Sequence, residues 1–338
     1  MSTSGTTIKI TAPGRAGIIG NPSDMYGGAV LACSVGLQAK VEISASSRLM
    51  LIHNECRCEI RNTKDLMLTG DRFDVVRAVL QYRGMPGQPF QLQYSSTIPI
   101  RSGLAGSTAL LTALLKAILL WQGESPNPYQ LAEMVCSVED NHLKITGGFQ
   151  DAYMCVFGGL NYLDFRRKQF DSKEGSVYAT VEPLSSQHNI ELPFVLATTG
   201  VERVSGAIHK PIAERWRAGE ADVVTGYRTI AEIAQAGKRA FLNREWKRLG
   251  ELMNENHHIQ RALGGSGESN ERLIAAALQA GALGAKLAGA GGGGTIIALW
   301  PHHDVQPLEQ ALLKAGASAC YDPGIFPGVT QFKDEKAK

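Results

Sequence analysis

At several places along the chain, apolar residues either alternate with polar ones or gather in short runs, and this pattern predicts β-strands. The predicted strands are residues 8–10, 29–43, 49–52, 89–100, 160–165, 194–199 and 295–300. The run over 89–100 is the clearest, because Phe90, Leu92 and Tyr94 alternate with polar residues. Such alternation is typical of a strand with one buried face.

Longer apolar patterns predict helices. The segment 108–121 is apolar almost all round, which is typical of a central helix that is buried on every side. Asn127 followed by Pro128 is a helix start, a cap residue before a first-turn proline, and we expect this helix to end near 147–148. Further helical patterns in the second half of the chain cover residues 222–242, 244–262 and 269–280.

Strands and helices follow each other without a regular βαβ order, so the pattern predicts an α+β fold. The segment 166–190 is polar and irregular, and we expect the boundary between two lobes there. A length of 338 residues suits two domains. We therefore expect an N-terminal lobe over 1–180 and a C-terminal lobe over 181–338.

Composition narrows the class of protein. Apolar residues make up 44% of the chain and charged residues 20%, which is ordinary for a soluble globular protein. The 34 basic and 32 acidic residues nearly cancel, so we expect no nucleic-acid partner. The apolar stretch 109–121 contains Lys116 and is too short to span a bilayer, and residues 1–10 lack the apolar core of a secretory signal. We expect a cytoplasmic protein without a membrane partner.

The cysteines indicate neither a disulfide framework nor a zinc site. Six cysteines occur and none forms a CxxC pair. Cys56 and Cys58 lie near His53, but no second ligand cluster completes a metal site. We expect reduced, mostly buried thiols.

Glycine is the most unusual part of the composition, at 37 residues, and one glycine-containing loop joins a predicted strand to a predicted helix. This loop, Arg101–Ser107, leads into the helix over 108–121. The unpaired N–H groups and the positive end of the dipole at a helix start can hold a phosphate. The alternative is a tight turn capped by Ser107. The Walker A pattern is absent, so we do not expect a P-loop NTPase.

A second glycine run, Gly289–Gly294, matches the letters of a dinucleotide-binding motif. That motif needs a strand before it and a helix after it. We expect the reverse order here, with a helix before the run and a strand from Thr295 after it. We therefore expect the glycines to permit a close approach to a ligand or to the other loop.

Three acidic residues are candidates for chemistry. Glu139 lies near the end of one predicted helix and Asp151 follows the glycine pair at 147–148, so a turn can bring both to one site. Such a pair can hold Mg²⁺ and act on a hydroxyl, or can consist of two solvated surface acids. Asp24 lies in a polar loop, where it can bind sugar hydroxyls or form an Asx turn.

In this order, these segments resemble the three motifs of the GHMP kinases. The first motif resembles Ala12–Arg15 with the loop 20–28, the second Gly103–Ala109 and the third Lys286–Gly294. The stretches 17–26, 148–152 and 157–165 are most similar to glucuronokinase-like sugar 1-kinases. Heptose 7-phosphate kinases share the Gly147–Asp151 element.

The resemblance implies a two-lobed fold with an N-terminal ribosomal protein S5 domain 2-like lobe and a C-terminal ferredoxin-like lobe. It also implies ATP and Mg²⁺ as cofactors, and Asp151 and Arg15 as catalytic residues. The implied nucleotide-binding residues are Arg101, Ser102, Gly103, Leu104, Ala105, Gly106, Ser107 and Thr108. The implied metal ligands are Ser107 and Glu139. The implied substrate-binding residues are Asp24, Tyr26, Gln150, Gly291 and Gly292.

The chain also departs from the family pattern. The usual Gly-Glu-His triplet is replaced by Gly20-Asn21-Pro22, and the usual Gly-Leu-Gly-Ser-Ser by a loop with Ala105 and Gly106, which removes one hydroxyl. Arg15 stands where several members have lysine. Arginine suits bidentate contacts with a phosphate or a carboxylate.

The resemblance predicts ATP-dependent phosphorylation of a sugar or sugar-acid hydroxyl, foremost the anomeric one, giving glucuronate 1-phosphate. The alternatives are a heptose phosphate, galactose or mevalonate as the acceptor, or a non-catalytic sugar-binding relative. A uronate carboxylate needs a cation, for which Arg15, Arg101 and Arg203 are candidates. The expected partners are ATP and this small molecule, bound by a monomer or homodimer.

Overall fold

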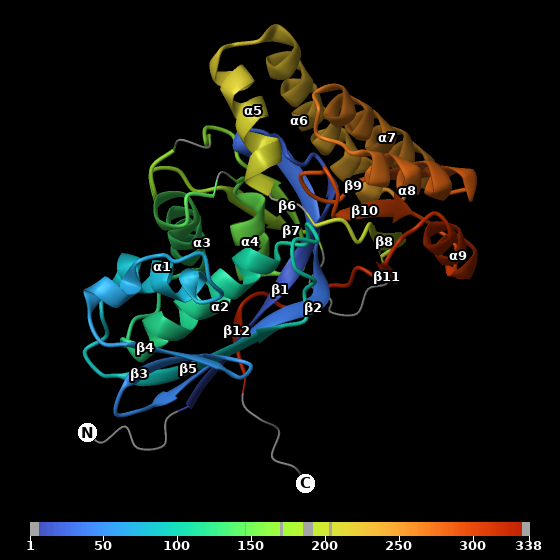
Figure 1. Cartoon of the computed structure of the whole chain (residues 1–338). Coiled ribbons are helices and arrows are strands. Elements are labelled where there is room, and N and C mark those ends of the chain that lie inside the picture. Colours follow the sequence, from blue (N-terminus) through green and yellow to red (C-terminus); the bar gives the residue numbers. More distant parts are fainter. Residues whose placement is uncertain (1–6, 146, 170–171, 185–191, 203–204, 333–338) are drawn as a thin grey trace.

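The structure is a computed structural model of the whole chain, and it describes all residues except 1–6, 146, 170–171, 185–191, 203–204 and 333–338. Two β-sheets lie at its centre, each covered by helices (Figure 1). Among the helices of the described segments, none combines the length and the apolar character that crossing a membrane requires.

The larger sheet is built on two long antiparallel strands, β1 (Thr7–Ile19) and β2 (Ala29–Ala45). Its order is β12-β1-β2-β5-β3-β4, and β6 and β7 continue from the first half of β2. These other strands are β3 (Leu49–His53), β4 (Cys56–Ile60), β5 (Phe90–Ser96), β6 (Leu160–Asp164), β7 (Thr180–Pro183) and β12 (Thr330–Gln331). Since β12 pairs with β1, the end of the chain returns to the sheet in which it began.

Four helices accompany this sheet: α1 (Asp74–Arg83), α2 (Gly106–Trp121), α3 (Pro128–Ser137) and α4 (Gln150–Phe157). The predicted central helix is α2, which packs on β1 and β2 and is buried along most of its length. Helix α3 begins as predicted, because Asn127 and Gln130 form a reciprocal capping box in front of Pro128. It ends at Ser137 and continues as one π-helical turn, Val138–His142, earlier than expected.

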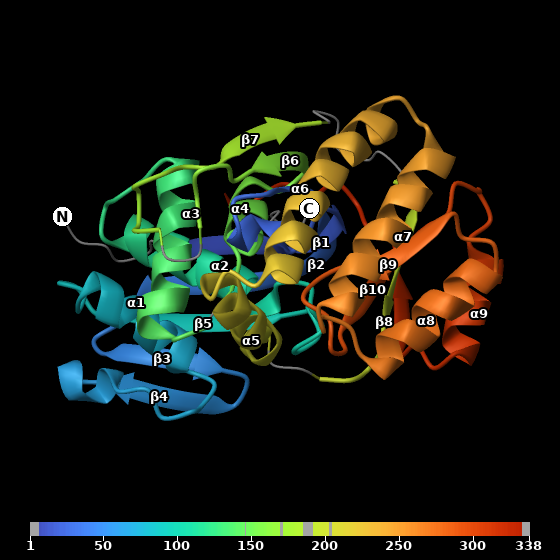
Figure 2. The same cartoon turned by 90° about the horizontal axis from the view of Figure 1, so that it is seen from above.

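The smaller sheet is antiparallel, in the order β11-β8-β10-β9, and lies with α8 and α9 at the opposite end from β3 and β4 (Figure 2). Its strands are β8 (Phe194–Thr198), β9 (Gly284–Leu287), β10 (Thr295–Leu299) and β11 (Ala319–Tyr321). The remaining helices are α5 (Ser205–Arg217), α6 (Ala221–Leu242), α7 (Trp246–Ala262), α8 (Glu268–Gln279) and α9 (Gln306–Lys314). Helix α7 contacts β1 and β9, and α6 packs on β1 and β2 and places Phe241 against Phe194 of β8, so one apolar core joins the two halves.

Several expectations from the sequence need correction. The polar segment 166–190 contains β7, whose hydrogen bonds to β6 outweigh its weak local pattern. The glycine run Gly289–Gly294 is preceded by β9 rather than by a helix, and it is followed by a strand, as expected. All six cysteines are free, but only Cys33 and Cys155 are buried.

The pattern also missed short or irregular helices. Helix α4 has eight residues, and α5 contains Pro211. Both are too short or too interrupted to show a clear helical period. The division of the chain near residue 180 stays a prediction.

Candidate active site

The loop between β5 and α2 exposes the start of a helix without a side-chain cap. Helix α2 begins after Ala105, whose backbone is left-handed with φ of 60° and which offers no capping side chain. Arg101 is also left-handed, with φ of 54°. Such strain in residues other than glycine is concentrated at functional sites. The first N–H groups of α2 are therefore not claimed by a side-chain cap, against the alternative of a turn capped by Ser107.

Two distant segments hold this loop in place. The backbone N–H of Arg15 donates to the Leu104 carbonyl at 3.1 Å, and the Thr295 hydroxyl donates to the Ser102 carbonyl at 2.6 Å. A Cβ on Gly14 would lie 2.6 Å from the Leu104 oxygen, so only glycine permits this approach. The first and third glycine-rich motifs thus meet the second.

The third motif uses its glycines to pack closely against other segments of the chain. A Cβ on Gly291 would lie 1.7 Å from the carbonyl oxygen of Gly265, and one on Gly292 would lie 2.6 Å from Ile208. The Asn270 side chain accepts from the N–H of Gly293 at 2.6 Å and donates to its carbonyl at 3.0 Å. The close approaches that Gly291–Gly293 make in the structure are therefore to Gly265, Ile208 and Asn270, and an approach to a ligand stays a prediction.

Arg15 is the central side chain of the site. Its Nε and Nη2 lie 2.7 and 2.6 Å from Oδ1 of Asp151, and its Nη1 donates to the Gly103 carbonyl at 2.7 Å. The Arg15 side chain is 5% exposed and that of Asp151 26%. One guanidinium therefore joins the phosphate-loop candidate to the carboxylate in the first turn of α4.

Glu139 faces the same centre from the π-helical turn. Its Oε1 accepts a hydrogen bond from the Thr108 hydroxyl at 2.6 Å. Burial raises the pKa of Glu139 to about 8, against the lowering effect of Thr108, and nearby Asp151 raises it further. Ser107 is exposed at the start of α2, so Thr108 rather than Ser107 contacts this carboxylate directly.

The charge balance at Glu139 fits a divalent cation. The carboxylate is buried, and its one hydrogen-bond partner among the described residues is neutral. Nowhere in the described ranges do three His, Cys, Asp or Glu side chains cluster closely enough to hold a metal by themselves. Mg²⁺ typically takes few protein ligands when phosphate oxygens complete its coordination shell.

Asp24 is fully buried in a short 3-10 turn, Ser23–Met25. Its Oδ2 accepts from the N–H of Gln150 at 3.0 Å, and its Oδ1 from the Gln150 side chain at 3.3 Å. A Cβ on Gly148 would lie 2.0 Å from Oδ2. Burial, partly offset by the Gln150 N–H, raises the pKa of Asp24 to about 6.

Two further features belong to the surroundings of Asp24. Oε1 of Gln150 is buried and has no hydrogen-bond partner within the described part of the chain. Tyr26 is buried, and its ring lies 4.1 Å from that of Tyr227 and 4.7 Å from that of Trp216. Burial and Asp24 raise the pKa of the Tyr26 hydroxyl. Together they provide polar acceptors beside an aromatic wall.

A buried lysine that the pattern did not single out connects the halves of the molecule. Lys286 Nζ donates to Oδ1 of Asn21 and to the Leu287 carbonyl, both at 2.6 Å. Burial, with nearby Arg15 adding to the effect, lowers the pKa of Lys286. Oδ1 of Asn256 accepts from the N–H of Gly20 at 2.8 Å. The unusual Gly-Asn-Pro triplet therefore makes structural contacts to β9 and α7.

Comparison with known proteins identifies the family of this chain. A profile of the GHMP kinases N terminal domain matches residues 72–159, and a profile named GHMP kinases C terminal matches residues 238–318. The chain belongs to the GHMP kinase superfamily. The α+β, two-domain fold of this superfamily is confirmed by the likeness to solved structures.

Similar proteins within the superfamily differ in the substrate that they are named for. Glucuronokinase 1 of Arabidopsis thaliana is 26% identical over 89% of this chain and 88% of its own. The D-glycero-alpha-D-manno-heptose 7-phosphate kinase of Campylobacter jejuni is 24% identical, over 85% of this chain and 88% of its own. The structure of Lactococcus lactis galactokinase complexed with galactose has a TM-score of 0.80 at 18% identity, covering 97% of this chain and 96% of its own. The protein is thus an ATP-dependent GHMP small-molecule kinase.

The three arginines considered as partners for a uronate carboxylate have different surroundings in this GHMP kinase. Arg15 is engaged by Asp151 and backbone carbonyls. Arg101 is exposed and lies 3.2 Å from Glu202 in an ion pair. Arg203 lies outside the described residues.

Proposed function

We propose that this kinase phosphorylates the anomeric hydroxyl of a sugar or sugar acid, with glucuronate as the acceptor and glucuronate 1-phosphate as the product. The supporting observation is that Gln150 and Asp151 lie next to each other at the start of α4. The first contacts the buried carboxylate of Asp24 and the second contacts Arg15. Polyol-binding acceptors thus lie beside a candidate base.

The nucleotide side of the proposal uses residues 101–108. The backbone N–H groups of Gly106, Ser107 and Thr108 at the uncapped start of α2 bind phosphate oxygens, with the helix dipole adding attraction. Arg101, Ser102 and the loop through Ala105 complete the cradle. We assign the N-terminal lobe, 1–180, to ATP binding and the lobe 181–338 to closing the site with its third glycine motif.

We propose Ser107 and Glu139 as the protein ligands of Mg²⁺. Bound there, the ion would neutralise charge on the phosphates during transfer. The Thr108 hydroxyl holds the Glu139 carboxylate by its hydrogen bond to Oε1. Thr108 therefore orients the ligand whether or not it contacts the ion.

Asp151 and Arg15 carry the proton transfer in this proposal. Both guanidinium contacts go to Oδ1 of Asp151, so Oδ2 is left to accept the proton of the acceptor hydroxyl. The hydroxyl oxygen then forms the bond to the γ-phosphorus of ATP while the bond to the β,γ-bridging oxygen breaks. Alignment and charge stabilisation supply most of the rate in such a reaction.

The acceptor side rests on Asp24, Gln150 and Tyr26, with Gly291 and Gly292 shaping the opposite wall. Asp24 accepts hydroxyl donors, and Oε1 of Gln150 has an unused acceptor position for another. A buried acceptor without a partner costs free energy, so a ligand hydroxyl there gains affinity. Tyr26 offers an aromatic face to the apolar side of a sugar ring.

The test is ATP consumption against a panel of glucuronate, galactose, heptose phosphate and mevalonate, with the position of the new phosphate read by phosphorus NMR. We expect glucuronate to have the highest kcat/KM and the product to carry phosphate on the anomeric oxygen. A preference for another acceptor would replace glucuronate as the substrate. Binding of a sugar without ATP turnover would instead indicate a non-catalytic relative.

A further inference from the structure

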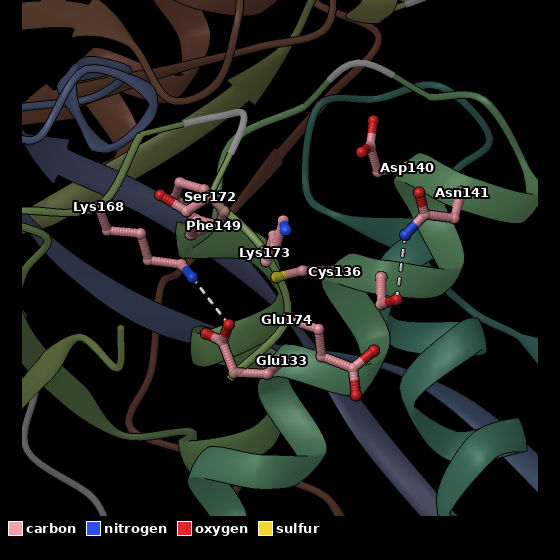
Figure 3. Close-up of a pocket in the computed structure, with 10 residues that line it drawn as sticks. Glu133, Cys136, Asp140, Asn141, Phe149, Lys168, Ser172, Lys173 and Glu174 are labelled. Carbon is pink, nitrogen blue, oxygen red and sulfur yellow. Dashed lines mark hydrogen bonds and ion pairs between the residues drawn. The ribbon is translucent and has the colours of Figure 1, made fainter. Parts of the chain in front are cut away.

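A cavity of about 230 Å³ lies on the side of α3 that faces the loop after β6 (Figure 3). Its lining is largely polar and charged, although it lies beside the core of the N-terminal lobe. The lining includes Glu133 of α3, Phe149 and Lys168. Figure 3 shows Lys168 pointing at Glu133, and these two side chains form an ion pair of 2.7 Å.

This ion pair is almost completely buried, with side chains that are 1% and 3% exposed. Lys168 Nζ also donates to the Val177 carbonyl at 3.1 Å and lies 4.4 Å from the ring centroid of Phe149. The other carboxylate oxygen of Glu133 accepts from the Tyr153 hydroxyl at 2.6 Å. Both charges therefore have good partners, which a buried pair needs to persist.

The network around the pair connects two helices that carry site residues, because the Tyr153 hydroxyl of α4 donates to Glu133 of α3. Glu133 lies on α3, whose π-helical continuation carries Glu139. Tyr153 lies on α4 two residues after Asp151, and Phe149 lies two residues before Asp151, immediately before the start of α4. The network therefore holds the helix of the proposed base against the helix that leads to the proposed metal ligand.

A buried ion pair is a poor way to gain stability, because desolvation offsets most of its attraction. It does define geometry, since a shift or turn of α4 takes the Tyr153 hydroxyl away from Glu133 and the Phe149 ring away from Lys168. A misplacement of about 1 Å in an active site can lower a rate by about 10²-fold. A buried pair of this kind therefore suits a role in geometry better than a role in stability.

We propose that Glu133, Lys168 and Tyr153 are positioning residues that set Asp151 relative to Glu139, and so align the acceptor hydroxyl with the phosphoryl group. This inference rests on the proposed function for its effect on catalysis. Its structural part, the fixing of α4 by the ion pair, is tested without any assay of activity.

The principal test is the double variant Glu133→Gln/Lys168→Met, which removes both charges together and retains an oxygen for Tyr153. We expect kcat to fall at least tenfold while KM for ATP changes less than twofold and the melting temperature stays close to that of the wild type. In an Asp151→Asn background, the same pair of substitutions is expected to lower kcat less than twofold, because it acts through Asp151.

The chain offers a control in a second, less buried lysine that pairs with a glutamate beside an aromatic ring. Lys238 forms an ion pair with Glu182 and lies 4.6 Å from the ring centroid of Tyr162. This pair joins α6 to β7, and neither residue lies on α3 or α4. Glu182→Gln/Lys238→Met is expected to leave kcat unchanged.

Hydrogen exchange separates this inference from the proposed function. We expect the amides of α4 to exchange at least tenfold faster in the Glu133→Gln/Lys168→Met variant, with those of α2 unchanged. If the double variant does not fold, Tyr153→Phe tests the same network, with a severalfold fall in kcat and faster exchange in α4. Wild-type kcat, wild-type exchange in α4, or a fall in kcat without faster exchange would each overturn the proposal. A wild-type protein without kinase activity would refute the proposed function, whereas the exchange data would still decide whether the pair fixes α4.

Discussion

The phosphate-loop candidate and the acceptor side of the site are built in opposite ways. Residues 101–108 are one continuous segment, and their chemistry lies in backbone N–H groups at the start of α2. The acceptor side takes Asp24, Arg15 and Asp151 from three elements and depends on their side chains. A backbone site tolerates changes of side chain, whereas a side-chain site loses its function with one substitution.

The largest expected effect is on the side-chain half of the site. Asp151→Asn removes the proton acceptor, and we expect kcat to fall by about 10²–10⁴-fold, as for other general bases. Binding of ATP, measured by calorimetry, is expected to stay within about twofold because the phosphate contacts are backbone N–H groups.

The matched control for Asp151→Asn is Asp140→Asn. Asp140 is exposed and directly follows Glu139 in the sequence. The substitution Asp140→Asn is expected to leave kcat unchanged. Near-normal turnover of Asp151→Asn would remove Asp151 from the mechanism and weaken the contrast between the two halves.

A smaller effect is expected at Asp24, which binds rather than reacts. Asp24→Asn keeps the shape of the side chain but removes the charge, and we expect KM for the acceptor to rise about tenfold or more. KM for ATP is the internal control and should not change. A rise of both constants together would show that Asp24 supports the whole site rather than the acceptor.

Glu139 titrates, whereas the backbone N–H groups at the start of α2 do not, so the pH dependence of stability tests the side-chain half of the site alone. Burial raises the pKa of Glu139 from its ordinary 4.5 to about 8, so the folded protein holds this proton more tightly than the unfolded chain does. The contribution to stability is complete below about pH 4.5 and is lost as the pH rises through about 8. We therefore expect the melting temperature to fall between pH 5 and pH 8.5 by more in the wild type than in Glu139→Gln.

Asp24, whose pKa is also raised, is present in both proteins of this comparison and so does not affect the difference. Mg²⁺ with ATP should reduce the fall in the wild type, because the ion favours the charged carboxylate. Parallel curves for the two proteins would mean that the Glu139 carboxyl titrates normally.

The smallest expected effect is in the backbone half. Ala105 is left-handed, so Ala105→Gly should relieve strain and stabilise the protein by about 1 kcal/mol, while KM for ATP stays within about twofold. The control is Ala275→Gly, which places glycine on an exposed face of α8 and should destabilise by about 1 kcal/mol. A large rise in KM for ATP in Ala105→Gly would mean that the loop depends on its strained conformation.

Local sequence was sufficient for the features that depend on neighbouring residues. The start of α3 follows from Asn127 and Pro128, and the order of β5, the glycine loop and α2 follows from one alternating run before one apolar run. Motif order alone also indicated the family. The π-helical turn and α4 could not be predicted, because each is too short to show a period.

The pairings that make the site were decided by tertiary structure. Arg15 meets Asp151 across 136 residues, Asp24 meets Gln150 across 126, and Lys286 meets Asn21 across 265. Backbone propensity acts over a few residues, whereas these contacts depend on the register of β1 with β2 and on the packing of α4 and β9. The sequence by itself therefore determined the residue types and the order of the motifs, and the fold decided which buried charges face one another, because each must find a partner in the desolvated interior.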